Sequence, residues 1–457
     1  MRIEKDTMGE VELPEDSYYG AQSQRAFENF QISNKKIPRP MIVSIAMIKR
    51  SAAIINNRLE LIDLKTKDAI VKAADEVIQG KFDNQFIVDI YQTGSGTSSN
   101  MNANEIIANR ACEILKGSRG DKSLVHPNDH VNLGQSSNDV IPTSIHIAAL
   151  NELTKRLIPE LLLLQKSLHK KSEKFKDIIK IGRTHLQDAT PITLGQEFSG
   201  YSEMVLKNIN RIKSNFTSLS YLAQGGTAVG TGINTHKDFG KLIAQEISNI
   251  TNIDFQESIN HFESQATQDS IVHLSGSLKT LAVSLYKIAN DIRWLASGPR
   301  SGLGELVLPA VQPGSSIMPG KVNPVICESL IQVSAQVIGN DSAITQGGLG
   351  GVFELNLMLP LIGYNILESI NILTNGIKMF RLKLIDGLEA DEEKCKSYIE
   401  ASLAMCTSLA PIIGYDKAAM IAKKAYKKNK TIRQIAIEDN ILSKEELDKI
   451  LDPFSMI

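Results

Sequence analysis

Residues 271–295 read "IVHLSGSLKTLAVSLYKIANDIRWL", and this stretch decides the fold class. Its apolar side chains recur every three or four residues, at Ile271, Leu274, Leu278, Leu281, Leu285, Ile288, Ile292 and Leu295. A helix with 3.6 residues per turn places all of them along one side. With a rise of 1.5 Å per residue, such a helix is roughly 40 Å long. A stripe of this length is buried only against other helices, so the sequence predicts a bundle.

The same apolar period recurs in four other stretches, which begin at Leu150, Leu194, Ile326 and Ile366. The heptad-like spacing favours helices that pack nearly parallel, at crossing angles of about 20°. Pro159 falls inside the first of these stretches without breaking its phase, and we expect a kink there. The predicted fold is all-α, with a long-helix bundle as its central domain and smaller, mainly helical domains at both ends.

The predicted domain boundaries follow changes in this pattern. Residues 1–134 form an N-terminal domain with one clear amphipathic helix near 41–60. Residues 135–390 hold the long stripes and form the central bundle domain. Residues 391–457 form a small C-terminal helical domain, because the helices there are shorter and more charged and a capping box "SKEE" stands at 443–446.

The bulk composition excludes several classes of function. Of the 457 residues, 42% are hydrophobic and 22% charged, and the formal net charge is -1. This balance argues against a general nucleic-acid-binding surface. No apolar run reaches the length that spans a membrane, and the N-terminus lacks a signal-peptide pattern. We therefore expect a cytoplasmic protein with no nucleic-acid partner and no membrane partner.

The cysteines argue against a metal centre. The four residues Cys112, Cys327, Cys395 and Cys406 form no CxxC pair, and no histidine stands at zinc spacing from them. An iron–sulfur cluster needs clustered thiolates, so that chemistry is disfavoured as well. The sequence predicts neither a metal ion nor a cofactor, and a reduced intracellular environment.

The links between the long stripes are rich in Gly, Ser, Thr and Asn. Six of their side chains are predicted near helix N-termini, namely Ser95, Thr97, Ser136, Ser137, Asn138 and Thr184. Each of them alone is readily explained as a helix cap. Several such loops at the ends of one bundle, with neighbouring glycines, indicate instead a site that binds carboxylates through hydroxyls and backbone N–H groups.

Titratable residues accompany these loops. Arg183, His185 and Lys321 have the most polar surroundings, and Glu328 lies at the start of a predicted helix. Glu328 by itself fits a first-turn acid that the helix dipole favours. The sequence contains no phosphate-binding glycine loop and no HExxH motif. Taken together, these residues indicate proton chemistry on a small organic acid.

The motif "GSSIMPGKVNP" at 314–324 resembles the signature loop of the fumarase/aspartase superfamily. The resemblance covers essentially the whole chain, from "GAQSQRAFENF" to "IGYDKAAMIAKKA". Within the superfamily the sequence is most similar to the class II, iron-independent fumarate hydratases. The motif "GRTHLQDATP" has His185 where aspartases usually have Gln, whereas Val325 and Ile326 are similar to the aspartase form.

The resemblance implies a mechanism and a set of site residues. Ser315 is the base that removes a C3 proton from malate, although the residues leave open whether Ser315 or Ser316 carries the charge. Lys321 and loop N–H groups stabilise that anion, and His185 paired with Glu328 assists the leaving hydroxyl. The substrate-binding residues implied are Ser95, Gly96, Thr97, Ser136, Ser137, Asn138, Thr184, Ser316, Lys321, Val322 and Asn323.

The resemblance also implies an assembly and a second site. The family forms homotetramers in which each active site draws loops from three chains, acting on fumarate and malate in the tricarboxylic acid cycle. The segment "HPND", which is His126, Pro127, Asn128 and Asp129, resembles a secondary dicarboxylate site. Ser123 stands where related enzymes often have arginine, so that site depends on whether Lys122 substitutes for it.

Two other functions stay open at this point. One is aspartate ammonia-lyase activity, since aspartase belongs to the same superfamily. The other is a catalytically inactive superfamily member with a structural or binding role. Incubation with fumarate, with and without ammonia, distinguishes aspartase from fumarate hydratase, because only aspartase requires ammonia. Turnover of any fumarate-yielding substrate would exclude the inactive role.

Overall fold

The computed structural model describes residues 1–457, and the chain divides into two compact units. Unit 1 consists of Met1–Pro159, Asn210–Ala282 and Ala335–Thr374. Unit 2 consists of Glu160–Ile209, Val283–Ser334 and Asn375–Ile457. Each unit thus gathers three separate stretches of the sequence. The predicted domain boundaries after residues 134 and 390 stay predictions.

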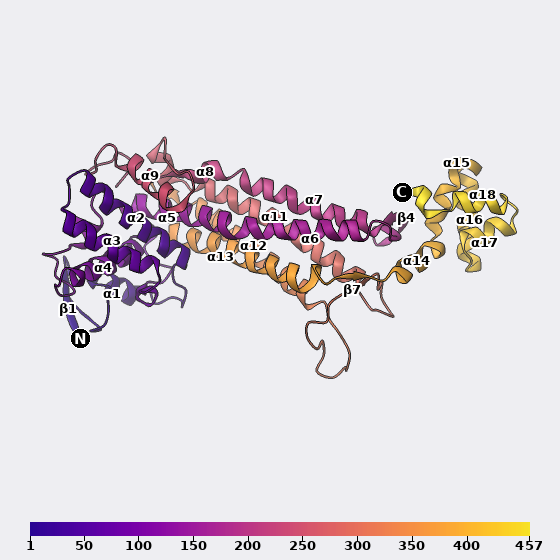
Figure 1. Cartoon of the computed structure of the whole chain (residues 1–457), viewed down its shortest axis with the longest axis horizontal. Coiled ribbons are helices and arrows are strands. Elements are labelled where there is room, and N and C mark those ends of the chain that lie inside the picture. Colours follow the sequence, from indigo (N-terminus) through magenta and orange to yellow (C-terminus); the bar gives the residue numbers. More distant parts are fainter. The chain divides into compact units, whose positions relative to one another are not determined.

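Five long helices confirm the predicted all-α class (Figure 1). They are α6 (Ile158–Lys174), α7 (Leu194–Lys213), α11 (Asp269–Leu295), α12 (Val325–Gly348) and α13 (Leu359–Phe380). The eight apolar side chains of the 271–295 stripe are all buried, with at most 5% of any one exposed. The stripes that begin at Leu150 and Ile366 are buried as well. Burial of these side chains, each worth about 1.5–3 kcal/mol, holds the helices against their neighbours.

Pro159 lies at the second position of α6, directly after a change in helix geometry. The helix α5 (Ser137–Glu152) is followed by a π-helical turn, η3 (Leu153–Leu157), and then by α6. Proline has no N–H to donate to the preceding turn, and a wider turn there accommodates its ring. The apolar stripe continues through this change, since Leu153 and Leu157 are both fully buried.

The rest of unit 1 consists of further helices, of which α2 and α4 are the longest, and three two-stranded sheets. The helices are α1 (Ala21–Asn29), α2 (Arg39–Arg58), α3 (Leu64–Ile78), η1 (Asp83–Gln85), α4 (Thr97–Ile114), η2 (Pro127–Val131), α8 (Phe216–Ser220), α9 (Phe239–Thr251) and α10 (His261–Ala266). The strand pairs are β1 (Arg2–Asp6) with β2 (Gly9–Leu13), β5 (Tyr221–Leu222) with β6 (Gln256–Glu257), and β8 (Gly351–Val352) with β9 (Leu355–Asn356). The helix predicted near 41–60 is α2.

Unit 2 contains two strand pairs and the C-terminal helices. The pairs are β3 (Ile179–Thr184) with β4 (Gln187–Thr193), and β7 (Leu306–Val307) with β10 (Glu389–Ala390). The helices are η4 (Arg381–Ile385), α14 (Glu392–Ala401), η5 (Leu403–Ser408), α15 (Ala410–Ile413), α16 (Tyr415–Lys428), α17 (Ile432–Glu438), α18 (Lys444–Ile450) and η6 (Pro453–Met456). The predicted capping box at Ser443 and Glu446 is present at the start of α18.

The C-terminal helices and the β3–β4 hairpin share one apolar core. Ile179 and Ile181 of β3 are buried together with Ile399, Leu409 and Ile435. This packing fixes the base of the hairpin, while its tip, at residues 184–187, stays exposed. The tip is therefore held by the base of the hairpin rather than by contacts of its own.

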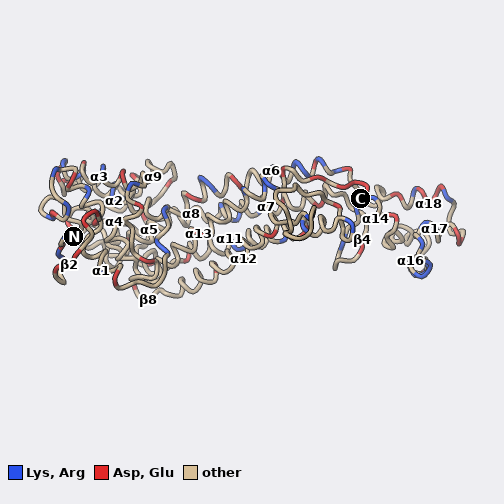
Figure 2. Tube along the Cα trace, turned by 90° about the horizontal axis from the view of Figure 1, so that it is seen from below, with Lys and Arg blue, Asp and Glu red and all other residues tan.

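The surface charge has no single sign. Lys and Arg residues occur alongside Asp and Glu residues through both units (Figure 2), and their numbers nearly balance, with a net charge of -1. No helix combines the length and the apolar character needed to cross a lipid bilayer.

Candidate active site

Three hydroxyl groups of unit 1 form a connected chain, which we call the hydroxyl cluster. The Ser95 Oγ lies 2.8 Å from the Thr97 Oγ1, and that atom lies 2.6 Å from the Ser137 Oγ. Ser95 and Ser137 are buried. Two loops that are 40 residues apart in the sequence therefore meet through side chains that the sequence predicted to bind substrate. Such hydroxyls donate to a carboxylate when each O–H rotates toward it.

Glycine makes the first of these loops possible. Gly96 caps α4 with a φ of 72°, in the left-handed region, and a Cβ atom there would lie 2.9 Å from Ile141. Gly94 lies so close to the Leu357 carbonyl that a Cβ atom would be 2.0 Å from its oxygen. The N-cap residue Gly96 has no side chain to cap α4, and the Gln92 Oε1 accepts only the Ser99 N–H of the first turn, at 3.0 Å. The N–H groups that stay free in this turn and the helix dipole favour a negatively charged group at this position.

The second loop starts α5 with a reciprocal capping box. The Ser136 Oγ accepts a hydrogen bond from the Asn138 backbone N–H, and the Ser136 N–H donates to the Asp139 carboxylate. Asn138 also donates its side-chain amide to the Ala228 carbonyl at 2.8 Å. Ser136 therefore acts as a helix cap within the chain, whereas Ser137 presents its hydroxyl to Thr97.

Thr184 and His185 stand at the β-hairpin and not near a helix N-terminus. The sequence placed Thr184 near a helix start, and this was wrong, because Thr184 is the last residue of β3 and pairs with Gln187. His185 and Leu186 form the two-residue turn with φ values of 56° and 60°. A turn with positive φ at both positions matches the twist of the strands, and for a residue with a Cβ it is strained. The His185 imidazole is exposed and has no hydrogen bond within the chain.

The signature loop, residues 314–324, folds back on itself. The Gly314 N–H donates to the Lys321 carbonyl at 2.8 Å, and the Asn323 side chain donates to the Gly314 carbonyl at 2.6 Å. A Cβ atom on Gly314 would lie 2.4 Å from the Lys321 carbonyl oxygen, which explains the glycine. Residues 310–322 enclose a hollow of about 440 Å³. The predicted turn is therefore closed by its own backbone before α12 begins.

Two serines of this loop differ in their contacts. The Ser315 Oγ accepts hydrogen bonds from the backbone N–H groups of Ile317 and Met318, at 3.2 and 3.0 Å. Backbone donors of this kind stabilise negative charge on the oxygen that accepts them. Ser316 is exposed, and its hydroxyl has no hydrogen bond. The contacts thus favour Ser315 over Ser316 as the serine whose anion the loop supports.

Glu328 lies in the first turn of α12 and is exposed. Its carboxylate has no ion pair or hydrogen bond within the chain, and neither has the exposed Lys321 ammonium. The predicted pair of His185 with Glu328 is therefore not formed in the single chain, and it stays a prediction for the assembled protein. Val322 is exposed beside Lys321 and lines the hollow.

Arg183, which the sequence singled out for its polar surroundings, has a structural partner. Its guanidinium donates to both carboxylate oxygens of Glu305, at 2.9 and 2.8 Å, and Glu305 is fully buried. Lys180, which is also buried, lies 3.5 Å from the same carboxylate. A bidentate pair of this kind fixes the strand, so Arg183 is committed to holding β3.

The segment His126 to Asp129 opens the π-helical turn η2. The His126 Nδ1 accepts hydrogen bonds from the backbone N–H groups of Asn128 and Asp129, both at 3.1 Å, and Pro127 is buried. Burial lowers the pKa of His126, and the Asp129 carboxylate opposes that shift. Ser123 donates to Asp121, and the Lys122 ammonium donates to the Lys5 carbonyl. His126 is thus a cap, and Lys122 is engaged elsewhere in the chain.

Two buried groups close to the hydroxyl cluster were missed by the sequence reasoning. Asp139 and Lys49 are both fully buried. The signal for Asp139 was its place three residues after Ser136, which is the spacing of a capping box. Nothing in the sequence marks Lys49, because it lies in the middle of α2 and meets the loop only through the fold.

Comparison with known families identifies the class of protein. The model of a family described as "Lyase" matches residues 9–339, and a model described as "Fumarase C C-terminus" matches residues 405–457. The first match covers well over half of the chain. The fold and the loops described above are therefore those of a lyase.

Individual relatives narrow the class. "Fumarate hydratase class II" of Wigglesworthia glossinidia brevipalpis is 51% identical over 456 residues, covering 100% of this chain and 98% of the relative. The protein of the same name from Helicobacter pylori is 48% identical with the same coverage. The crystal structure of class II fumarase from Schistosoma mansoni superposes with a TM-score of 0.97 at 42% identity, covering 100% of this chain and 98% of that one. The chain belongs to the class II fumarate hydratase family.

Proposed function

We propose that this protein hydrates fumarate to malate reversibly, as a step of the tricarboxylic acid cycle. The observation that carries the proposal is identity near 50% over the whole chain to several proteins named fumarate hydratase class II. The site supports it as well, because hydroxyls and backbone N–H groups suit a dicarboxylate and His185 stands at an exposed turn. Val325 and Ile326 are similar to the aspartase form, but His185 and the full-length relatives favour fumarate hydration.

In the direction from malate, we assign Ser315 as the base. Its alkoxide takes the C3 proton, and the electron pair of that C–H bond first adds charge to the neighbouring carboxylate and then forms the C2–C3 double bond. The C2 hydroxyl leaves as water after taking a proton from His185, which Glu328 holds in place. Proton transfer by a positioned group is worth about 10²–10⁴ in rate. A serine hydroxyl needs activation for this role. Lys321 and the N–H groups of Ile317 and Met318 supply the stabilisation.

We assign substrate carboxylates to the remaining loop groups. One set is the hydroxyl cluster with the free N–H groups of the first turn of α4, after Gly96, and the side chains of Ser136 and Asn138. The other set is Thr184, Ser316, Lys321, Val322 and Asn323. A hydrogen bond to a charged group contributes about 1.5–3 kcal/mol. The bonds that strengthen as charge moves onto the carboxylate also lower the barrier.

The experiment that tests the activity is absorbance of fumarate on addition of the purified protein, with and without ammonia. We expect loss of fumarate and formation of malate in both cases. A strict requirement for ammonia would assign the protein to the aspartases. No turnover of malate, aspartate or other fumarate-yielding substrates by folded protein would assign it an inactive, structural role.

We propose that catalysis requires no metal ion. No group of three or more His, Cys, Asp or Glu side chains is arranged to hold a metal, and the four cysteines are free. Activity should survive dialysis against a chelator. Recovery of lost activity only after iron is added back would overturn this part of the proposal.

We further propose a homotetramer whose active sites combine loops of three chains. The support is that the exposed His185, Lys321 and Glu328 have no partners within one chain. Mixing refolded Ser315→Ala and His185→Asn chains tests it. If the two residues of a site come from different chains, random mixing restores about a quarter of the sites. If they come from the same chain, every site keeps one lesion and the mixture stays inactive.

We propose a weak second dicarboxylate site formed by His126, Pro127, Asn128 and Asp129. The support for the site is the free Nε2 of His126, since only its Nδ1 is engaged. Calorimetric titration with malate should give two binding events per chain, and His126→Asn should leave one.

We also propose a cytoplasmic location for the protein. Fractionation of cells tests the location.

A further inference from the structure

Two of the buried carboxylates of unit 1 each accept three backbone N–H groups. They are Glu105 in α4 and Asp139 in the first turn of α5. Burial raises the pKa of both carboxyl groups, while the hydrogen bonds they accept oppose that shift. Burying a carboxylate is costly unless its oxygens are satisfied, so each of these residues holds other segments in place. The two differ in which segments they hold.

Asp139 joins the start of α5 to a glycine-rich loop, residues 225–232. One carboxylate oxygen accepts the Ser136 N–H at 2.9 Å. The other accepts the N–H groups of Gly225 and Thr227, at 3.1 and 3.0 Å. Thr227 has a φ of 53°, so its backbone is strained and needs a partner to keep it there. A single side chain thus fixes two loops against each other.

Both of those loops touch the proposed substrate-binding residues. Ser137 follows the Ser136 cap and contacts Thr97, and Asn138 donates its side-chain amide to the Ala228 carbonyl in the glycine-rich loop. The direction in which Ser137 and Asn138 point therefore depends on the position of Asp139.

Lys49 stabilises the loop that leads into Ser136 and Asp139. Its buried ammonium donates to the Asn132 Oδ1 at 2.8 Å and to the Gln135 Oε1 at 3.0 Å. The same Asn132 oxygen accepts from the side-chain amides of Asn100 and Asn104 in α4, both at 3.2 Å. The asparagine thus links the helix that starts at Thr97 with the loop that leads into Ser136. Lys49 also offsets the negative charge of Asp139.

We propose that Asp139, with Lys49 as a supporting hydrogen-bond donor, is a positioning residue that sets how tightly this protein binds a substrate carboxylate. The inference rests on the proposed fumarate hydration. Asp139 does not touch the substrate. It holds Ser137 and Asn138 in register with the hydroxyl cluster, so its loss weakens substrate binding more than it slows proton transfer by Ser315.

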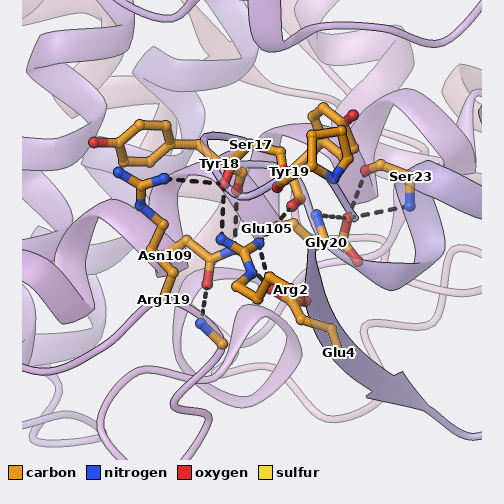
Figure 3. Close-up of polar contacts among 12 residues, drawn as sticks. Arg2, Glu4, Ser17, Tyr18, Tyr19, Gly20, Ser23, Glu105, Asn109 and Arg119 are labelled. Atoms are coloured by element: carbon orange, nitrogen blue, oxygen red, sulfur yellow. Dashed lines mark hydrogen bonds and ion pairs between the residues drawn. The ribbon is translucent and has the colours of Figure 1, made fainter. Parts of the chain in front are cut away.

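Glu105 provides the matched control (Figure 3). Its carboxylate accepts the backbone N–H groups of Gly20, Gln22 and Ser23 and the Ser23 hydroxyl. Like Asp139 it is buried, but it stands eight residues into α4, about 12 Å along the helix from Thr97. Figure 3 shows its oxygens directed at Gly20 and Ser23, in the segment that also meets Arg2 and Glu4.

The test compares Asp139→Asn with Glu105→Gln. Each amide keeps one oxygen acceptor and places an NH₂ group where an oxygen faced backbone N–H groups, so both variants should lose similar thermal stability. In steady-state assays with malate, Asp139→Asn should raise KM at least tenfold and change kcat less than threefold. Glu105→Gln should leave both constants within twofold of the parent protein. A KM for Asp139→Asn within twofold of the parent, or an equal rise in both variants, would overturn the proposal.

A second pair of variants covers the case in which the carboxylate variants do not fold. Lys49→Met removes the hydrogen bonds to Asn132 and Gln135 and leaves the Asp139 carboxylate in place. Lys171→Met is its control, because Lys171 is also buried but donates to the Leu388 carbonyl in unit 2. We expect a severalfold rise in KM only in Lys49→Met. Equal KM values in the two lysine variants would contradict the positioning role proposed for Lys49 and Asp139.

A binding measurement separates this inference from the proposed function. Succinate resembles the substrate but lacks the double bond and the hydroxyl, so its binding is measured by calorimetry without turnover. If the parent protein hydrates fumarate while Asp139→Asn binds succinate as tightly as the parent does, the inference fails and the function stands. If the parent protein shows no turnover of fumarate or malate, the proposed function fails first.

Discussion

In unit 1 the side chains proposed to bind substrate contact one another, whereas in unit 2 the groups proposed to transfer protons have few contacts within the chain. Ser95, Thr97 and Ser137 form a hydrogen-bonded chain, and Asp139 fixes the loops around them. His185 and Glu328 are exposed and lack side-chain partners. The difference teaches that the hydroxyl cluster is already connected within a single chain. If the proposed assembly forms, His185 and Glu328 gain their partners there.

The largest effect is expected at the signature loop. Ser315→Ala removes the proposed base, and kcat should fall toward the upper end of the range of about 10²–10⁴ that such groups contribute. Ser316→Ala is the comparison variant: Ser316 is proposed to contact a substrate carboxylate, so its loss should raise KM and leave kcat far less changed than Ser315→Ala does. The measurement is kcat for malate, with the assembly checked by light scattering. Equal losses in the two variants would mean that the contacts to Ile317 and Met318 do not identify the base.

A second large effect is expected at the hairpin tip. His185→Asn removes the imidazole, and we expect kcat to fall by about 10²–10⁴. Asparagine tolerates positive φ, so the turn should keep its shape. Leu186→Asn, at the neighbouring position with a similar φ, serves as the control and should retain normal kcat. Near-normal kcat in His185→Asn would remove the acid from the mechanism.

A smaller effect, on binding, is expected in the hydroxyl cluster. Thr97→Val keeps the shape of the side chain and removes the hydroxyl that joins Ser95 to Ser137. Loss of a hydrogen bond to a charged group costs about 1.5–3 kcal/mol, so KM for malate should rise roughly 10- to 150-fold. Thr93→Val, which breaks the exposed contact of Thr93 with Ser98, is the control. If KM rises equally in both, the cluster has no special role in binding.

The smallest expected effect is a change in how stability depends on pH. Burial lowers the pKa of the Lys49 ammonium to about 7, and Asp139 opposes that shift. Between that value and about 10.4 the unfolded chain holds a proton that the folded chain lacks, so this group makes the fold more stable as pH rises. Below pH 7 both forms are protonated, and the cost of the buried charge is constant.

Comparison with Lys49→Met isolates this contribution. From pH 7 to pH 9 the stability of the parent protein relative to the variant should increase, by up to about 1.4 kcal/mol per pH unit. Removal of Lys49 also raises the pKa of Asp139 further, which acts with the same sign. Urea denaturation at a fixed protein concentration measures the difference at each pH. Parallel curves for the two proteins would show that Lys49 does not titrate in this window.

Most of the helical fold could be predicted from the sequence, because helix burial follows a local period. The stripe from Ile271 to Leu295 marks one face of α11 without knowledge of what covers it, and every residue of the stripe is buried. The same reasoning misplaced Thr184. The hairpin that carries it depends on a two-residue turn at His185 and Leu186, neither of which is a usual residue for positive φ.

In the candidate site, too, some residues could be predicted from the sequence and others could not. The sequence singled out Ser95, Thr97 and Ser137 because small hydroxyls beside glycine have a recognisable chemistry at loop positions. It could not identify Lys49, whose partners Asn132 and Gln135 are more than eighty residues away. It also could not show that Arg183 is committed to Glu305, a contact across 122 residues.

The sequence by itself determined the helical class and the loops that carry the polar chemistry, because periodicity and residue type are local properties of the chain. Only the tertiary structure decided which of those polar groups are satisfied within the chain and which are left exposed. Hydrogen bonds and buried charges depend on distances between segments remote in sequence, and those distances are set by how the helices pack. For this reason Asp139 and Lys49 became visible only in the folded protein.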